Sequence, residues 1–245
     1  MGEVTYIDAI REAQHDLLDT DDRVFIYGQD VGHFGGAFKA TRGLKDLFPD
    51  RVIDCPISED AMIGLAVGAS IEGMRPIIEM QFADFSSVGF NQIVNQAAKM
   101  RYMFGGKARI PLTIRTTIGA GFRAAAQHSD ATYSTFVHFP GLKVVAPATP
   151  HDAKGLLLSA IRDDDPVIFC ENKVLYDTTG PVPEGDYTLP LDSAGHPREG
   201  SDVTIVAISR MVHFSLEAAE RLAAEGIEAD VIDLRCLSPW DENAI

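Results

Sequence analysis

The hydrophobic residues of this chain recur with two different spacings, which predict helices and buried strands. Residues 59–70 are apolar almost all the way round a helix, which is typical of a helix buried between a sheet and its neighbours, and Ser58 is its expected N-cap. Residues 5–18 instead place their apolar side chains on one stripe at helical spacing, behind Thr5 as a cap: Ile7, Ile10, Ala13, Leu17 and Leu18. The chain therefore begins with an amphipathic helix and contains at least one buried helix.

Short runs rich in β-branched residues and bounded by Gly or Pro lie between the helical segments. Because such runs are typical of parallel strands covered on both faces, their alternation with helices predicts an α/β fold class with a doubly wound, mostly parallel sheet. The predicted strands are 23–32, 51–59, 75–85, 110–119, 142–148 and 165–172, and the helices between them are 59–70, 88–103 and 150–162.

The domain organisation follows from where Pro and Gly gather. Residues 177–200 contain four of the thirteen prolines and four glycines, which disfavours helix and buried strand and predicts a linker after a first domain at 1–176. Residues 201–245 then read as strand, helix and strand, with the helix ended by Gly226. One such unit cannot bury both faces of its sheet. It either packs on the first domain or begins a second α/β domain that is incomplete at Ile245, and we expect the second.

Composition narrows the classes of partner. A formal charge of -15 disfavours nucleic acid and anionic membranes, since both would repel the chain. No apolar run approaches the roughly 20 residues that span a bilayer. Three widely spaced cysteines, Cys55, Cys170 and Cys236, indicate a reducing compartment, so we expect a cytoplasmic protein without disulfides.

Several kinds of site find no support in the sequence. The seven histidines show no zinc-binding spacing with one another or with cysteine, so structural zinc is not expected. The glycine-rich segments GHFGGAF and IGAGF match neither the dinucleotide fingerprint nor a Walker pattern, and tight turns explain them as well as phosphate binding does. The hydrolase motif G-x-S-x-G is absent.

Four positions remain as candidates for chemistry, each with a structural alternative. Glu59 stands at the start of the buried helix, where the partial positive charge of a helix end explains an acid without any catalytic role, as it does for Asp60. His128 follows a run of small residues and could equally be a hydrogen-bonded structural histidine. Phe82 and Phe85 would by default be core aromatics.

Five runs, in the same order, resemble one family across essentially the whole chain. They are PISEDAMIGLAVGAS, NQIVNQAAKMRYMFGGKARIPLTIRTT, AAAQHS, the long run from FPGLKVV to ENKVLY, and EGSDVTIVAISRMVHFSLEAA. Together they resemble the beta subunit of the thiamine-diphosphate-dependent first component of 2-oxo acid dehydrogenase complexes. The segments RYMFGGKA, IRDDDPVIFCE and RMVHF are most similar to the acetoin dehydrogenase branch.

The resemblance implies a fold, a cofactor, partners and site residues. Residues 1–176 would be a transketolase-like domain that binds the aminopyrimidine of thiamine diphosphate, and 201–245 the start of a transketolase-like carboxyl-terminal domain. An alpha subunit would hold the diphosphate and magnesium in an α2β2 heterotetramer, and the acyl group of a 2-oxo acid or acetoin would pass to a lipoyl-bearing acyltransferase core. In agreement, the chain lacks the family's diphosphate motif, a Gly-Asp-Gly followed by an Asn pair.

By the same resemblance Glu59 would face the pyrimidine ring nitrogen, where a carboxyl that shares a proton favours the imino tautomer that serves as an internal base. Phe85, Phe82 and Ile57 would form the apolar wall of the cofactor site. His128 would lie at the channel through which substrate and the lipoyl arm enter.

The chain departs from the family pattern at two places, and a further ion is implied. Gln29 replaces a glutamate common in relatives, and Asp130 places an extra acid beside His128, which would raise the pKa of that imidazole and disfavour an anionic substrate. The resemblance also implies a structural potassium ion, whose ligands would be Leu112, Thr113, Ala160, Asp163 and Asp165. The acids before Pro166 are equally explained as a solvated turn.

Two other functions compete with an active beta subunit. A catalytically degenerate scaffold of the same fold would retain subunit contacts alone. A different transketolase-type thiamine enzyme would carry both halves of the cofactor site on one chain, which the missing diphosphate motif disfavours.

Overall fold

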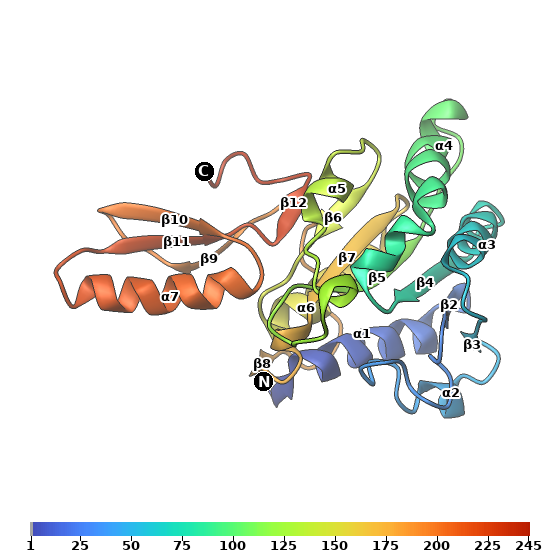
Figure 1. The fold of residues 1–245 in the computed structure, drawn as a ribbon, viewed down its shortest axis with the longest axis horizontal. Coiled ribbons are helices and arrows are strands. Elements are labelled where there is room, and N and C mark those ends of the chain that lie inside the picture. The colour runs from blue at the N-terminus through green and yellow to red at the C-terminus, as the bar shows by residue number, and fades with distance from the viewer. Residues whose placement is uncertain (1) are drawn as a thin grey trace.

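The computed structural model describes residues 2–245 and contains one large, mostly parallel sheet. Its seven strands lie in the order β12-β6-β7-β5-β4-β2-β3 (Figure 1). They are β2 (Val24–Gly28), β3 (Val52–Asp54), β4 (Arg75–Met80), β5 (Thr113–Ile118), β6 (Lys143–Val145), β7 (Val167–Asn172) and β12 (Cys236–Ser238). All neighbouring pairs are parallel except β12 and β6. The predicted α/β fold class is confirmed.

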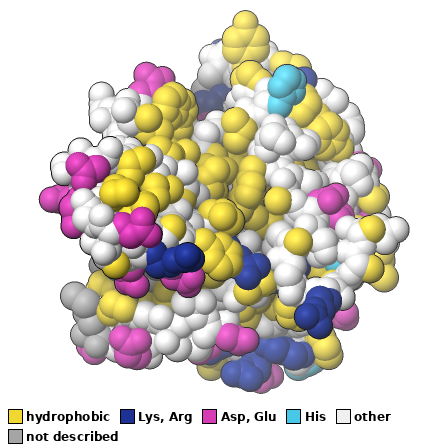
Figure 2. All heavy atoms as spheres, turned by 60° about the vertical axis from the view of Figure 1, so that its left-hand side comes forward, with side chains coloured by type: hydrophobic (Ala, Val, Ile, Leu, Met, Phe, Trp, Pro, Cys, Tyr) yellow, Lys and Arg dark blue, Asp and Glu magenta, His cyan; other side chains and the backbone are white. Residues whose placement is uncertain are grey.

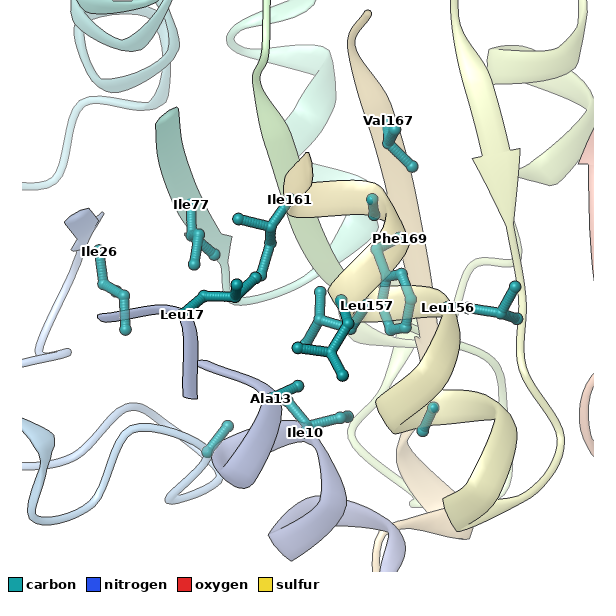
Figure 3. Close-up of a cluster of buried hydrophobic side chains, with 14 of the residues drawn as sticks. Ile10, Ala13, Leu17, Ile26, Ile77, Leu156, Leu157, Ile161, Val167 and Phe169 are labelled. Carbon is teal, nitrogen blue, oxygen red and sulfur yellow. The ribbon is translucent and has the colours of Figure 1, made fainter. Parts of the chain in front are cut away.

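Helices cover both faces of this sheet. On one face α1 (Tyr6–Thr20) packs against α6 (Pro150–Arg162), and side chains such as Leu17, Leu157 and Ile161 meet strand residues there (Figure 3). On the other face lie α3 (Glu59–Ile71), a π-helical segment at Gln92–Ala97 and α4 (Ala98–Met103). Strands β4, β5 and β7 are buried between these two apolar cores along almost their whole length, although β5 contains Arg115 and three threonines.

The predicted helix starts are found, and their N-cap residues differ in whether the side chain makes a capping hydrogen bond. The Thr5 hydroxyl accepts a hydrogen bond from the Asp8 amide at 3.2 Å, and Thr149 does the same for Asp152 at 3.1 Å. Ser58 stands at the N-cap of α3, yet its side chain makes no capping hydrogen bond. The N-cap position expected at Ser58 is therefore confirmed, without the side-chain hydrogen bond that Thr5 and Thr149 make.

Most predicted elements differ from the observed ones at their ends. The strand expected over 75–85 ends at Met80, because its neighbour β2 ends at Gly28 and offers no further partner, and the chain turns into a 3-10 helix at Ala83–Ser87. The helix expected over 88–103 has its π-helical part before α4. Helix α7 (Arg210–Ala223) ends three residues before Gly226.

Residues 177–200 contain two short, mostly exposed strands. Strand β8 (Thr179–Val182) pairs antiparallel with β1 (Gly2–Thr5), and β9 (Gly195–Arg198) pairs with β11 (Ala229–Asp233). The second sheet has the order β10-β11-β9, with β10 at Val203–Ala207, and α7 packs on one of its faces (Figure 1).

The carboxyl-terminal segment contributes to both sheets. After β11 the chain returns to the large sheet, where β12 pairs with β6. The three-stranded sheet and α7 form a smaller unit, which Figure 2 brings forward. This unit leaves large apolar side chains exposed: Val203, Val206, Met211, Phe214 and Ile227. Two further short helices, α2 (Leu44–Leu47) and α5 (Tyr133–Val137), complete the fold.

Candidate active site

The predicted site residues follow the carboxyl ends of the parallel strands, which is where ligands bind in open α/β sheets. Gln29 follows β2, and Glu59 begins α3 shortly after β3. Phe82 and Phe85 follow β4, and His128 lies in the segment after β5. The topology therefore brings residues that are up to a hundred positions apart to one edge of the sheet.

The two acids at the start of α3 occupy different environments. Glu59 is only 7% exposed, and its Oε1 accepts a hydrogen bond of 3.2 Å from Nε2 of Gln29. Asp60 is exposed and accepts a hydrogen bond of 3.2 Å from Nε2 of Gln92. Favourable interaction with the helix end explains an exposed acid such as Asp60, but it does not explain why Glu59 is buried.

The chain packs tightly around the start of α3. A Cβ atom at Gly89 would lie 2.5 Å from Cδ1 of Ile63 and 3.0 Å from the backbone oxygen of Glu59. Only a residue without a side chain fits at this position, so Gly89 allows the neighbouring segment to close over the first turn of α3. This packing holds the Glu59 backbone in place.

Three of the predicted residues form one aromatic group. The His128 ring lies with its centroid 4.2 Å from that of Phe82 and 5.5 Å from that of Phe85, and the two phenyl rings are 5.7 Å apart, all close to edge-on. The Nδ1 atom of His128 is buried and has no hydrogen-bond partner within residues 2–245. Ile57 is 83% exposed and does not join this group.

Asp130 and His128 do not form an ion pair with each other among the described residues. The Asp130 side chain is exposed. Adjacency in sequence does not fix where two side chains point in an irregular segment, so the effect of Asp130 on the imidazole stays a prediction. Asp130 instead lines a hollow of about 560 Å³, together with Asp84, Ser86, Gln127, Thr132 and others.

Two charged residues beside the aromatic group were missed by the sequence reasoning. Lys173 is 3% exposed, and its Nζ lies 5.6 Å from the centroid of the Phe82 ring. Burial lowers the pKa of this ammonium group, which the charge of Asp84 opposes. Neither the Lys173 Nζ nor the carboxylate oxygens of Asp84 have a hydrogen-bond partner among residues 2–245. The sequence did contain a signal for these two residues, because each charged residue follows shortly after a buried strand, where ligand-binding residues are found.

A second missed feature is a buried ionic network under the site. The Arg115 guanidinium donates to Glu171 at 2.7 and 2.9 Å and to Glu79 at 2.9 Å, and the Tyr176 hydroxyl donates to Glu171 at 2.7 Å. Burial works against the charged guanidinium, but the two carboxylates outweigh it and raise the pKa of Arg115. Burial raises the pKa of Glu79. The sequence signal for this network was the presence of one charged residue well inside each of the buried strands β4, β5 and β7.

The residues expected around potassium lie at the opposite end of the sheet, where β5 begins and α6 ends. The Thr113 hydroxyl is buried without a partner among the described residues. The carboxylate of Asp163 pairs with Lys143 at 2.5 Å, and that of Asp165 pairs with Arg101. The carbonyl oxygens of Leu112 and Ala160 accept backbone hydrogen bonds at 2.9 and 3.3 Å. Both carboxylates are therefore already neutralised by protein cations.

Known proteins match both parts of the chain. Residues 2–179 match the family described as "Transketolase, pyrimidine binding domain", and residues 192–245 match "Transketolase, C-terminal domain". The beta subunit of acetoin:2,6-dichlorophenolindophenol oxidoreductase from Cupriavidus necator is 52% identical over 97% of this chain and 73% of its own length. The beta subunit of 2-oxoisovalerate dehydrogenase from Bacillus subtilis is 48% identical over 100% of this chain and 76% of its own.

This chain belongs to the beta subunits of the acetoin and 2-oxo acid dehydrogenases.

Solved structures agree with this family on the fold. A structure titled "Split gene transketolase, inactive beta4 tetramer" superimposes with a TM-score of 0.80 at 25% identity and covers 98% of this chain and 74% of that chain. The beta-subunit family is one of thiamine-diphosphate-dependent enzymes. Within residues 2–245 of this member, no helix has the length and apolar character needed to cross a bilayer. The same residues contain no group of three or more His, Cys, Asp and Glu side chains placed to hold a metal ion.

Proposed function

We propose that this beta subunit holds the aminopyrimidine end of thiamine diphosphate with Glu59 and completes an active site with an alpha subunit. The observation that carries the proposal is a buried carboxyl group at the ligand-binding edge of the sheet, held by a neutral amide, with an aromatic group formed by the segments that follow β4 and β5 at the same edge. The reaction is cleavage of a carbon–carbon bond next to a carbonyl, followed by transfer of the acyl group to a lipoyl domain.

The residues present fit this cofactor. A carboxyl group can share a proton with a ring nitrogen, and the rings of Phe82 and Phe85 offer an apolar wall to a flat heterocycle. When bound, thiamine diphosphate supplies a nucleophilic carbon that attacks the carbonyl and accepts the electrons left when the bond breaks. The unpartnered Nδ1 of His128 and Nζ of Lys173 are polar groups that a cofactor, a substrate or a second chain would satisfy.

Glu59 and His128 take separate proton roles in this proposal. Low exposure of Glu59 keeps water from competing for the proton that its carboxyl group would share with the ring. The Nδ1 atom of His128 is buried beside the Phe82 ring, and we assign His128 to the substrate channel, where it donates or accepts one proton. Ile57, which is exposed here, would join the wall only when a partner chain covers it.

Acetoin is the substrate that we favour over a 2-oxo acid. The hollow near His128 is lined by two acids, Asp84 and Asp130, whose charge would repel the carboxylate of an oxo acid. A neutral hydroxyketone is not repelled. Two of the most similar relatives are named as acetoin oxidoreductases.

The assembly is proposed to be an α2β2 heterotetramer that docks on a lipoyl-bearing acyltransferase core, with magnesium held by the alpha chain. A transketolase with its gene split is described as inactive as a β4 tetramer, and we likewise expect this chain to be inactive alone. We also propose that Leu112, Thr113, Ala160, Asp163 and Asp165 surround a structural potassium ion. The free Thr113 hydroxyl supports this, and carbonyl oxygens rather than the paired carboxylates would complete the set.

The test is Glu59→Ala in the pair reconstituted with the alpha chain, assayed with acetoin and 2-oxo acids and an artificial electron acceptor. Loss of a carboxyl that holds a transferred proton should lower kcat by about 100-fold or more. Asp60→Ala is the matched control, since it removes the neighbouring exposed acid, and it should retain most of the activity.

Each rival function makes a different prediction for these measurements. A reconstituted wild-type pair that binds the alpha chain but turns over no substrate would favour the degenerate scaffold. Full activity of the purified single chain would favour a transketolase-type enzyme. Unchanged turnover of Glu59→Ala would remove Glu59 from the mechanism.

A further inference from the structure

Gln29 is the residue that contacts the functional part of Glu59 most directly. It follows the last residue of β2, is 8% exposed, and donates from Nε2 to Oε1 of Glu59 at 3.2 Å. Its own backbone oxygen accepts from Nε2 of Gln81, which follows β4, at 3.5 Å. The amide is thus held between the ends of two strands and does not depend on a mobile segment.

The Gln29 amide donates to only one of the two carboxyl oxygens of Glu59. Within residues 2–245 the Gln29 bond is the one side-chain hydrogen bond that the carboxyl group receives, and it occupies Oε1. A carboxyl oxygen that carries the proton accepts hydrogen bonds more weakly than the carbonyl oxygen of the same group, so the Gln29 N–H favours a proton on the other oxygen. When Glu59 is protonated, the proton is therefore directed to Oε2.

We propose that Gln29 is a positioning residue that fixes the orientation of the Glu59 carboxyl and restricts its exchangeable proton to Oε2. This inference rests on the proposed function of Glu59. It assigns a role to a residue that touches neither cofactor nor substrate and acts only through the carboxyl group.

Glu59 already has several acidic neighbours, so an uncharged side chain at position 29 avoids adding further charge repulsion. Asp30 follows β2, Asp54 is the last residue of β3, and Asp60 is the residue after Glu59 in α3. The thiol of Cys55 stays neutral, because burial raises its pKa to about 11. Three further neighbours are uncharged: Gln81, which follows β4, Gln92 in the segment that covers α3, and Ile63 of α3 itself. A second carboxyl at position 29 would meet Glu59 with no cation to offset the repulsion.

The experiment compares pH profiles of kcat for the complex with its alpha chain. Gln29→Glu preserves size but replaces the donor by a second acid, so the pair keeps one proton to higher pH than a lone carboxyl does. Whichever limb of the profile Glu59 controls should move to higher pH by about one unit or more. Gln29→Met removes the donor without adding charge and should lower kcat by about 3- to 10-fold, with little movement of the profile.

Gln92→Glu is the matched control, because it makes the same change beside the exposed Asp60. Its profile should coincide with that of the wild type. A Gln29→Glu profile that also coincides with the wild type would overturn the proposal. Thermal melting checks folding, and if Gln29→Met does not fold, the near-isosteric Gln29→Glu decides alone. Failure of the proposed function is seen separately, as unchanged kcat in Glu59→Ala.

Discussion

The carboxyl group of Asp233 is buried at the junction between the smaller unit and the first domain. It is 3% exposed, and its Oδ1 accepts a hydrogen bond of 3.0 Å from the Arg235 backbone amide. Burial, together with the charge of Asp152, raises the pKa of Asp233 to about 7. Asp152 itself is held ionised by Arg235, whose Nη1 lies 2.8 Å from it. The junction therefore contains an acid that prefers to be neutral.

This preference makes the stability of the fold depend on pH. An unfolded aspartate loses its proton near pH 4, whereas Asp233 keeps its proton in the folded chain up to about pH 7. Its stabilising contribution is complete below about pH 4 and is lost as the pH rises to about 7.

Asp233→Asn should therefore stabilise the chain at pH 8 by about 2–4 kcal/mol relative to the wild type, with no gain at pH 4. Urea denaturation at both pH values measures this difference. Asp177→Asn, an exposed aspartate, is the control and should show no such dependence. An equal effect of Asp233→Asn at both pH values would contradict the assignment.

Arg115 allows the cost of a buried charge to be compared with that of an exposed one. Arg115→Met leaves Glu79 and Glu171 buried without their cation, which should destabilise the fold by about 3–5 kcal/mol. Arg162→Met breaks an exposed two-bond pair with Asp186 and should cost at most about 1 kcal/mol. Denaturant midpoints of the two variants check the difference. Similar losses for both would show that the network adds little.

At the residue level, sequence reasoning found individual positions better than their partners. Glu59, Phe82, Phe85 and His128 were all named, and the fold places the last three in contact. The contact of Gln29 with Glu59 was missed, because thirty residues separate them and only the pairing of β2 with its neighbours brings them together. The Arg115 network was missed for the same reason, since its charges come from three strands.

At the level of elements, the helix caps provide a direct comparison. Thr5 makes a capping hydrogen bond to Asp8, whereas Ser58 makes none. Thr5→Ala should therefore lower stability by about 1 kcal/mol, and Ser58→Ala by less than about 0.5 kcal/mol. Thermal or chemical unfolding of the two variants measures both. A loss for Ser58→Ala as large as that for Thr5→Ala would show that the serine hydroxyl caps α3 in solution.

The elements that could be predicted from sequence were those with strong periodicity. Helices α1, α3 and α6 and strands β4, β5 and β7 bury long apolar stretches, and their patterns reflect that burial directly. Strand β12 has only three residues and no periodicity of its own. It is a strand because β6 offers an open edge, which is a tertiary effect that no local pattern records.

At the level of the whole molecule, the two sheets are joined by more than the connecting chain. β12 extends the large sheet, and Arg235 links the end of β11 to Asp152 in α6. In contrast, the exposed apolar side chains of the smaller unit and of α3, such as Leu65 and Ile71, have no cover in the single chain. Such surfaces are typical of subunits that associate, which agrees with a family of beta subunits.

The return of β12 to the large sheet also has a consequence for synthesis on the ribosome. Residues 143–145 emerge about ninety positions before the strand that pairs with them, so the nascent chain exposes the backbone of β6 for most of the time in which the smaller unit is translated. Lys143 lies on that strand, and a lysine on an open edge discourages pairing with other chains. The same side chain that holds Asp163 in the finished fold thus also protects the unfinished one from aggregation.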